Sequence, residues 1–149
     1  MNTAIVYCSK HHGNTRKLVE AIAAKHDVTL IDAQLQSDAD LSGYDVVGFA
    51  SGIYGFQFDP QVTKLAGKVL EGQRVFLLYT SAMNKDAHAK GVRQALAARG
   101  AVELGIFGCQ GYNTFGPFKL VGGTSKGHPD AQDIANAVAF FEQIVEKLL

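Results

Sequence analysis

The sequence lacks several features that would place the protein in other classes. It contains no apolar run near the roughly 20 residues that a membrane helix needs, and residues 1–4 lack the charged start of a signal peptide. Its 14 basic and 14 acidic residues give zero formal net charge, and no Lys or Arg cluster forms a stripe for nucleic acid. We therefore expect a cytoplasmic monomer that binds neither nucleic acid nor membranes.

Cysteine is scarce, and its placement argues against metal binding and thiol chemistry. Cys8 and Cys109 have no C-x-x-C or metal-ligand spacing, which indicates reduced, unreactive thiols. His11 and His12 are adjacent, and adjacent histidines rarely chelate one ion. Cys109 and His128 could form a nucleophile and base, but a packed cysteine is the favoured interpretation. We predict neither a metal site nor a catalytic residue.

The hydrophobic pattern predicts alternating strands and helices. The chain of 149 residues with 47% hydrophobic content can bury one core, so we expect one domain, 1–149. Strand patterns fall at 3–8, 28–32, 45–50, 74–80 and 102–108, with helical patterns between most of them. Five strands that alternate with helices indicate a parallel sheet of the α/β class.

Helix signals are strongest at two places. Asp59 and Pro60 fit the N-cap and first turn of a helix whose apolar residues run to Val69. The segment 130–148 repeats apolar residues at helical spacing, and 86–98 is a less apolar helix that contains Gly91. The segment 32–43 is polar and is expected to form a loop or a single turn.

The segment from Ile5 to Thr15 is the most informative part of the chain. An apolar run leads directly into a polar turn with Gly13 and then into a helical pattern. Side chains at this turn offer hydrogen bonds, glycine permits close backbone approach, and the helix directs its unpaired N–H groups to the same place. The pattern predicts a phosphate site, although helix capping alone would also explain Ser, Asn and Thr here.

These residues resemble the start of flavodoxins and flavodoxin-like FMN proteins. Gly13-Asn14-Thr15 is similar to the end of their phosphate motif, although the loop from Ser9 is one residue longer and more basic. The segment from Ala50 to Gly55 resembles the first flavin loop of flavodoxin-like oxidoreductases, including the protoporphyrinogen oxidases of that fold. The resemblance implies a three-layer sandwich with a five-stranded parallel sheet of order 2-1-3-4-5, helices on both faces, and FMN as cofactor.

In such sheets the ligand lies at the carboxyl ends of the strands, where the strand order reverses. Four predicted loops meet there, and we expect them to supply the cofactor-binding residues Ser9, Lys10, His11, His12, Gly13, Asn14, Thr15, Ser51, Gly52, Ile53, Tyr54, Gly55, Phe56, Thr80, Ser81, Cys109 and Tyr112.

Within this set, Tyr54 is the first candidate to stack on the flavin, ahead of Phe56 and Tyr112. Packing of Tyr54 and Phe56 against the next helix remains an alternative. In flavodoxins a peptide of this loop turns over on reduction, and either Gly52 or Gly55 could permit that turn. Thr80 and Ser81 would face the ring's polar edge or cap the following helix. The glycine-rich, aromatic segment 110–128 is longer than an ordinary connection and is expected to be functional.

The resemblance implies an electron carrier of the flavodoxin type, which would exchange electrons with a flavin or iron-sulfur reductase and an acceptor protein. One alternative is an FMN-dependent oxidoreductase that acts on a small molecule such as a quinone or porphyrinogen. Another is a binding module that keeps the fold without the flavin.

Overall fold

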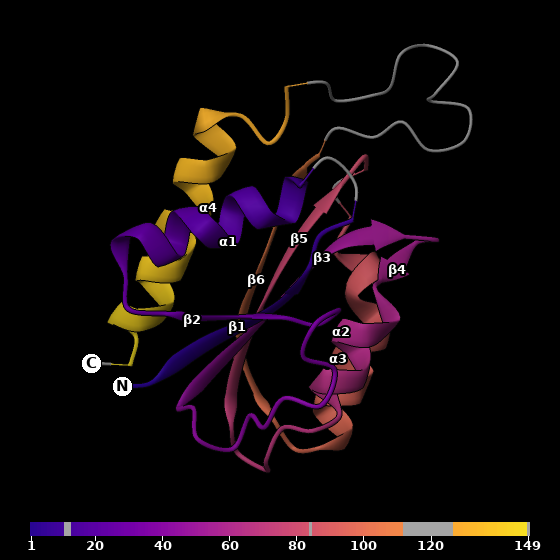
Figure 1. The fold of residues 1–149 in the computed structure, drawn as a ribbon, viewed down its shortest axis with the longest axis vertical. Helices are drawn as coiled ribbons and strands as arrows, with labels where there is room; N and C mark the ends of the chain where they lie inside the picture. The colour runs from indigo at the N-terminus through magenta and orange to yellow at the C-terminus, as the bar shows by residue number, and fades with distance from the viewer. Residues whose placement is uncertain (11–12, 84, 112–126, 149) are drawn as a thin grey trace.

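A parallel β-sheet forms the middle layer of the molecule, and helices cover both of its faces (Figure 1). The computed structural model describes residues 1–10, 13–83, 85–111 and 127–148. Its strands are β1 (Thr3–Cys8), β2 (Thr29–Asp32), β3 (Val46–Tyr54), β4 (Gln57–Phe58), β5 (Arg74–Ser81) and β6 (Val102–Gln110). Its helices are α1 (Asn14–Lys25), α2 (Pro60–Ala66), the 3₁₀ helix η1 (Asp86–Ala89), α3 (Lys90–Ala98) and α4 (Ala131–Glu146).

The strand order is β2-β1-β3-β5-β6, and all four pairings along this path are parallel. Counted over the parallel strands, this is the predicted order 2-1-3-4-5, so the fold prediction is confirmed. The prediction of only five strands was incomplete, because β4 pairs with β3 in an antiparallel hairpin. A strand of two residues has no periodic pattern that a sequence could reveal.

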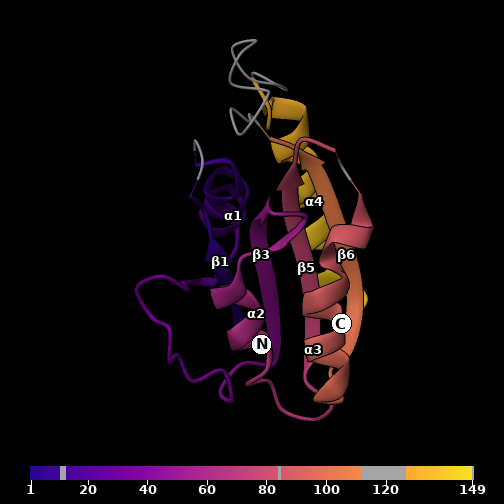
Figure 2. The same cartoon turned by 90° about the vertical axis from the view of Figure 1, so that its right-hand side faces the viewer.

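Alternation along β1 divides the core into two layers. Ala4, Val6 and Cys8 pack on the side of α2 and α3, whereas Ile5 and Tyr7 pack on the side of α1 and α4. Figure 2 shows α2 and α3 together on one face of the sheet. Both faces of the central strands are therefore buried, as the continuous apolar runs of parallel strands require.

The helix boundaries follow local capping. Asp59 accepts a hydrogen bond from the Gln61 N–H at 2.9 Å, as the Asp-Pro pattern predicts. The expected helix at 86–98 divides into η1 and α3, and the last helix begins after Asp130 rather than at it. Among the residues that the structure describes, no helix combines the length and apolar character that a membrane crossing requires.

Candidate functional site

A pocket lies at the carboxyl ends of the parallel strands, next to the point where the chain order reverses between β1 and β3. Residues from the loop after β1, the end of β3, the end of β5 and the end of β6 form its wall. They are Ser9, Asn14, Thr15, Gly52, Ile53, Tyr54, Thr80, Ser81, Ala82 and Gly111. None of these ten residues carries a formal charge, so the pocket offers neutral hydrogen-bonding groups.

The first turn of α1 supplies the part of the pocket that suits an anion. Gly13 is the N-cap residue and has φ of +64°, a left-handed conformation that glycine adopts without steric cost. Asn14 and Thr15 are buried and line the pocket. The Ser9 hydroxyl accepts a hydrogen bond from the Arg16 N–H at 3.1 Å, so Ser9 also caps the helix. Capping and pocket lining, the two interpretations of this segment, therefore coexist.

The end of β5 meets this turn directly. The hydroxyl oxygens of Thr15 and Thr80 lie 3.0 Å apart and are buried. The Ser81 hydroxyl accepts a hydrogen bond from the Met83 N–H at 3.1 Å, which stabilises the turn after β5. The cap residue of η1 is Lys85, which makes no side-chain cap. Thr80 and Ser81 thus lie at the pocket and do not cap the following helix.

The β3–β4 hairpin forms the opposite wall. Its turn consists of Gly55 and Phe56, with φ of +60° and +65°, as in the type I′ turns that suit hairpins. The structure places Gly55 in this turn, whereas Gly52 lies within β3. Phe56 is 73% exposed, and its ring lies 5.8 Å from that of His88. The alternative in which Phe56 packs against the next helix does not fit this exposure.

Two of the predicted loop residues, Ser51 and Lys10, do not line the pocket. The buried Ser51 hydroxyl donates to the Gly52 carbonyl at 2.6 Å and accepts from the Asp59 N–H at 2.9 Å. The Lys10 ammonium pairs with the buried Asp59 carboxylate at 2.7 Å, and this bond raises the pKa of Lys10. The positive charge of Lys10 is consequently balanced by Asp59.

The end of β6 contributes a glycine that sequence reasoning did not select. A Cβ atom on Gly111 would lie 2.7 Å from the side-chain amide nitrogen of Asn14 and 3.2 Å from the Cβ of Thr80, so only glycine leaves room for these two side chains. Ala82 was also missed. The signal for Gly111 was available, since a glycine directly after a strand can mark close backbone approach to a ligand.

Cys109, which the sequence suggested as a cofactor contact, is buried and does not line the pocket. It packs with Leu18 and Ala137, and burial raises its pKa to about 12. Burial also raises the pKa of Cys8 to about 12. Both cysteines are free, and β3 and β5 separate their strands. These values keep both thiols protonated and unreactive at neutral pH.

Three predicted contacts lie outside the described residues: His11, His12 and Tyr112. The same holds for most of the segment 110–128. Their predicted roles stay predictions.

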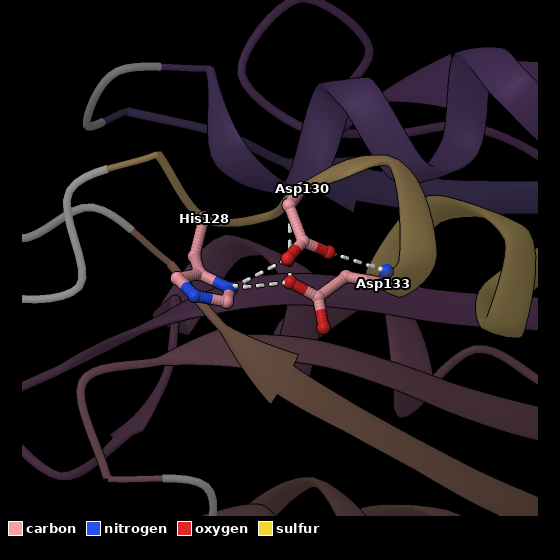
Figure 3. Close-up of side chains that lie close together, drawn as sticks. All are labelled: His128, Asp130 and Asp133. Carbon is pink, nitrogen blue, oxygen red and sulfur yellow. Dashed lines mark hydrogen bonds and ion pairs between the residues drawn. The ribbon is translucent and has the colours of Figure 1, made fainter.

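His128, Asp130 and Asp133 gather at the start of α4 (Figure 3). His128 Nδ1 lies 2.6 Å from Asp133 Oδ2. Asp130 and Asp133 also form a capping box, with reciprocal side-chain to backbone bonds of 2.8 and 2.9 Å. A helix N-terminus carries positive potential and disfavours a cation. We therefore interpret the cluster as a helix cap rather than a metal site.

Comparisons with known proteins agree with this architecture. A family profile described as a flavodoxin domain matches residues 4–115. An uncharacterized protein of Methanocaldococcus jannaschii is 33% identical over 149 residues, which cover 98% of this chain and 99% of that protein.

Solved structures with lower identity share the fold. A flavodoxin from the domain Archaea superposes with a TM-score of 0.66 at 15% identity, covering 97% of both chains. General stress protein 14 of Treponema denticola, in complex with FMN, also gives 0.66 at 12% identity, covering 97% of this chain and 99% of that one. An NADPH-quinone reductase of P. pentosaceus gives 0.60 at 13% identity, covering 94% and 97%.

Proposed function

This chain belongs to the flavodoxin family, and from that premise we propose that it binds FMN noncovalently and carries electrons between redox partner proteins. The main support is the convergence of the first turn of α1 with the ends of β3, β5 and β6 on one pocket of neutral hydrogen-bonding groups. This arrangement suits a ligand with an anionic end and a polar, partly aromatic body.

The residues present fit the phosphate of FMN. Asn14 and Thr15 stand in the first turn of α1, where N–H groups lack intrahelical partners and the helix dipole favours negative charge. Gly111 leaves room for the Asn14 side chain in this wall, because a Cβ there would collide with the amide group. A neutral donor set binds a phosphate without a competing carboxylate.

The remaining wall fits the ring end of the cofactor. Thr80 and Ser81 stand at the end of β5 and would face a polar edge, whereas Ile53 and Tyr54 offer apolar surface at the end of β3. FMN itself supplies the electron chemistry when bound, and the protein supplies binding, orientation and electrostatics. Suitable partners are a flavin or iron-sulfur reductase and an acceptor protein.

A second candidate function is an FMN-dependent oxidoreductase that acts directly on a small molecule such as a quinone or porphyrinogen. Its support is Phe56, an aromatic residue that is 73% exposed, has a left-handed backbone conformation and lies two positions after Tyr54 of the pocket wall. Strained, exposed aromatic residues beside pockets are often retained for ligand contact.

The experiment begins with the absorption spectrum of the purified protein and identification of any released flavin. Yellow protein that releases FMN supports the proposal, and protein that neither holds nor takes up FMN in titration contradicts it and indicates a flavin-free binding module. Steady oxidation of NAD(P)H or reduction of a quinone by the protein alone would favour the oxidoreductase. Turnover only with an added reductase supports the carrier.

A further inference from the structure

The side chain of Tyr54 turns back from the end of β3 onto the loop after β1. Its hydroxyl oxygen accepts a hydrogen bond from the Lys10 N–H at 2.9 Å, across 44 positions of sequence. Lys10 follows Ser9 in the loop that leads to the first turn of α1. A residue of the expected ring-binding hairpin therefore contacts the backbone of the phosphate loop.

Gly52 makes this conformation possible. Residues 52 and 54 of a strand point to the same face, so the phenol can lie over residue 52 only if that residue has no side chain. A Cβ on Gly52 would lie 2.6 Å from the Tyr54 hydroxyl and 2.7 Å from the ring carbon that bears it. Glycine at this position thus determines where the Tyr54 hydroxyl can go.

A second contact holds Lys10 from its other end. Its ammonium pairs with Asp59 at 2.7 Å and lies 5.7 Å from the centre of the Tyr54 ring. Asp59 is 1% exposed and also caps α2, so the pair is anchored in a fixed element. Burial raises the pKa of Tyr54, which keeps the hydroxyl protonated at neutral pH. Both ends of Lys10 are therefore held by the segment that runs from β3 to α2.

We propose that Tyr54 is a positioning residue of the phosphate site, whose hydroxyl fixes the Lys10 backbone and so favours a phosphorylated flavin over riboflavin. This inference rests on the proposed function, since it assigns Tyr54 a role toward the phosphate of FMN. It differs from a stacking role, in which the ring matters and the hydroxyl does not.

The test compares FMN and riboflavin affinity in wild type, Tyr54→Phe and Gly52→Ala by titration calorimetry. Tyr54→Phe keeps the ring and removes the hydroxyl, so FMN affinity should fall roughly fivefold, the effect of about one neutral hydrogen bond, while riboflavin affinity stays unchanged. Gly52→Ala displaces the phenol and should weaken FMN binding similarly. The double variant should be no weaker than the single variants, because both remove one interaction.

Tyr44→Phe is the matched control, since Tyr44 precedes β3 at the end of the sheet opposite to the pocket. It should alter neither affinity. Residue-resolved hydrogen exchange of the ligand-free protein gives an independent readout: the Lys10 amide should exchange faster in Tyr54→Phe and Gly52→Ala than in wild type or the control.

Three results of the affinity measurements would overturn the inference. They are an unchanged FMN affinity in Tyr54→Phe, an equal loss for FMN and riboflavin, and a gain in FMN affinity, which would mean that the hydroxyl competes with the phosphate. If wild type binds neither FMN nor riboflavin although its Lys10 amide is protected from hydrogen exchange, the proposed function fails. The role of Tyr54 toward the phosphate then fails with it. An unprotected Lys10 amide beside normal FMN binding would overturn the Tyr54 contact alone.

Discussion

The hydroxyl groups of Thr15 and Thr80 lie 3.0 Å apart in the buried wall of the pocket, although 65 positions separate them in the sequence. Thr15 belongs to the first turn of α1, and Thr80 lies near the end of β5. The contact joins the expected phosphate end of the site to the expected ring end. A change at either residue should therefore affect both the stability of the fold and the binding of the cofactor.

Thr15→Val should weaken FMN binding by about 10- to 100-fold, because one hydrogen bond to a charged group contributes roughly 1.5 to 3 kcal/mol. Riboflavin binding should change little, since it has no phosphate. Titration with both ligands measures this difference. Thr63→Val on α2 is the control and should leave both affinities unaltered. Equal losses for the two ligands would place Thr15 away from the phosphate.

Gly111→Ala should weaken FMN binding by roughly tenfold, because the new Cβ would lie 2.7 Å from the Asn14 amide nitrogen and displace a phosphate-site group. Gly91→Ala is a matched control in α3, where a Cβ would meet nothing within 4 Å. That change should stabilise the fold by about 0.5–1 kcal/mol and leave binding unaffected. Chemical denaturation measures the stability of both variants, and titration measures their FMN affinity. An unchanged FMN affinity in Gly111→Ala would contradict the assignment of Gly111 to the wall of the FMN pocket.

Phe56→Gly should be more stable than Phe56→Ala by about 1 kcal/mol, because φ of +65° is strained for any residue with a Cβ. Comparison of the two variants cancels the loss of the ring contact with His88. Urea denaturation of both proteins measures the difference. Equal stability would mean that the hairpin turn relaxes when the aromatic ring is removed.

His128 should make stability depend on pH. Its hydrogen bond to Asp133 raises the pKa of His128 above the ordinary value of about 6.5. A group with a raised folded-state pKa stabilises fully below its unfolded pKa, and this contribution disappears as the pH rises through the folded value. The melting temperature of wild type should therefore exceed that of His128→Gln most at about pH 5.5, and by progressively less above pH 6.5.

The same comparison in an Asp133→Asn background provides the control. Removal of that carboxylate leaves only Asp130, 3.8 Å from His128 Nδ1, so the pH dependence should become smaller. A difference between wild type and His128→Gln that stays constant from about pH 5.5 to 8 would show that the Asp133 bond does not depend on the charge of His128.

Local patterns were enough to predict the main elements. The predicted strand 3–8 agrees with β1, and Asp59 with Pro60 marks the start of α2. Alternation of apolar residues and cap residues act within a few positions of the chain, so their effects can be read without knowledge of the fold. The loop between β1 and α1 could also be located, because the strand, Gly13 and the helix are contiguous.

The sequence was less able to specify the site itself. It did not select Gly111 or Ala82, it proposed Cys109 as a contact, and it did not predict the β3–β4 hairpin. The structure places Gly55 with Phe56 in the turn of a hairpin whose second strand has only two residues. Such short elements depend on pairing with β3, which no local pattern encodes.

The sequence by itself thus determined the order of strands and helices, the family resemblance and the place of the loop between β1 and α1. Only the tertiary structure decided that Tyr54 turns back to Lys10, that Lys10 is balanced by Asp59, and that Gly111 faces Asn14. The physical reason is distance along the chain. Periodicity and capping are local, whereas these contacts join distant segments and depend on how the packed sheet brings its strand ends together.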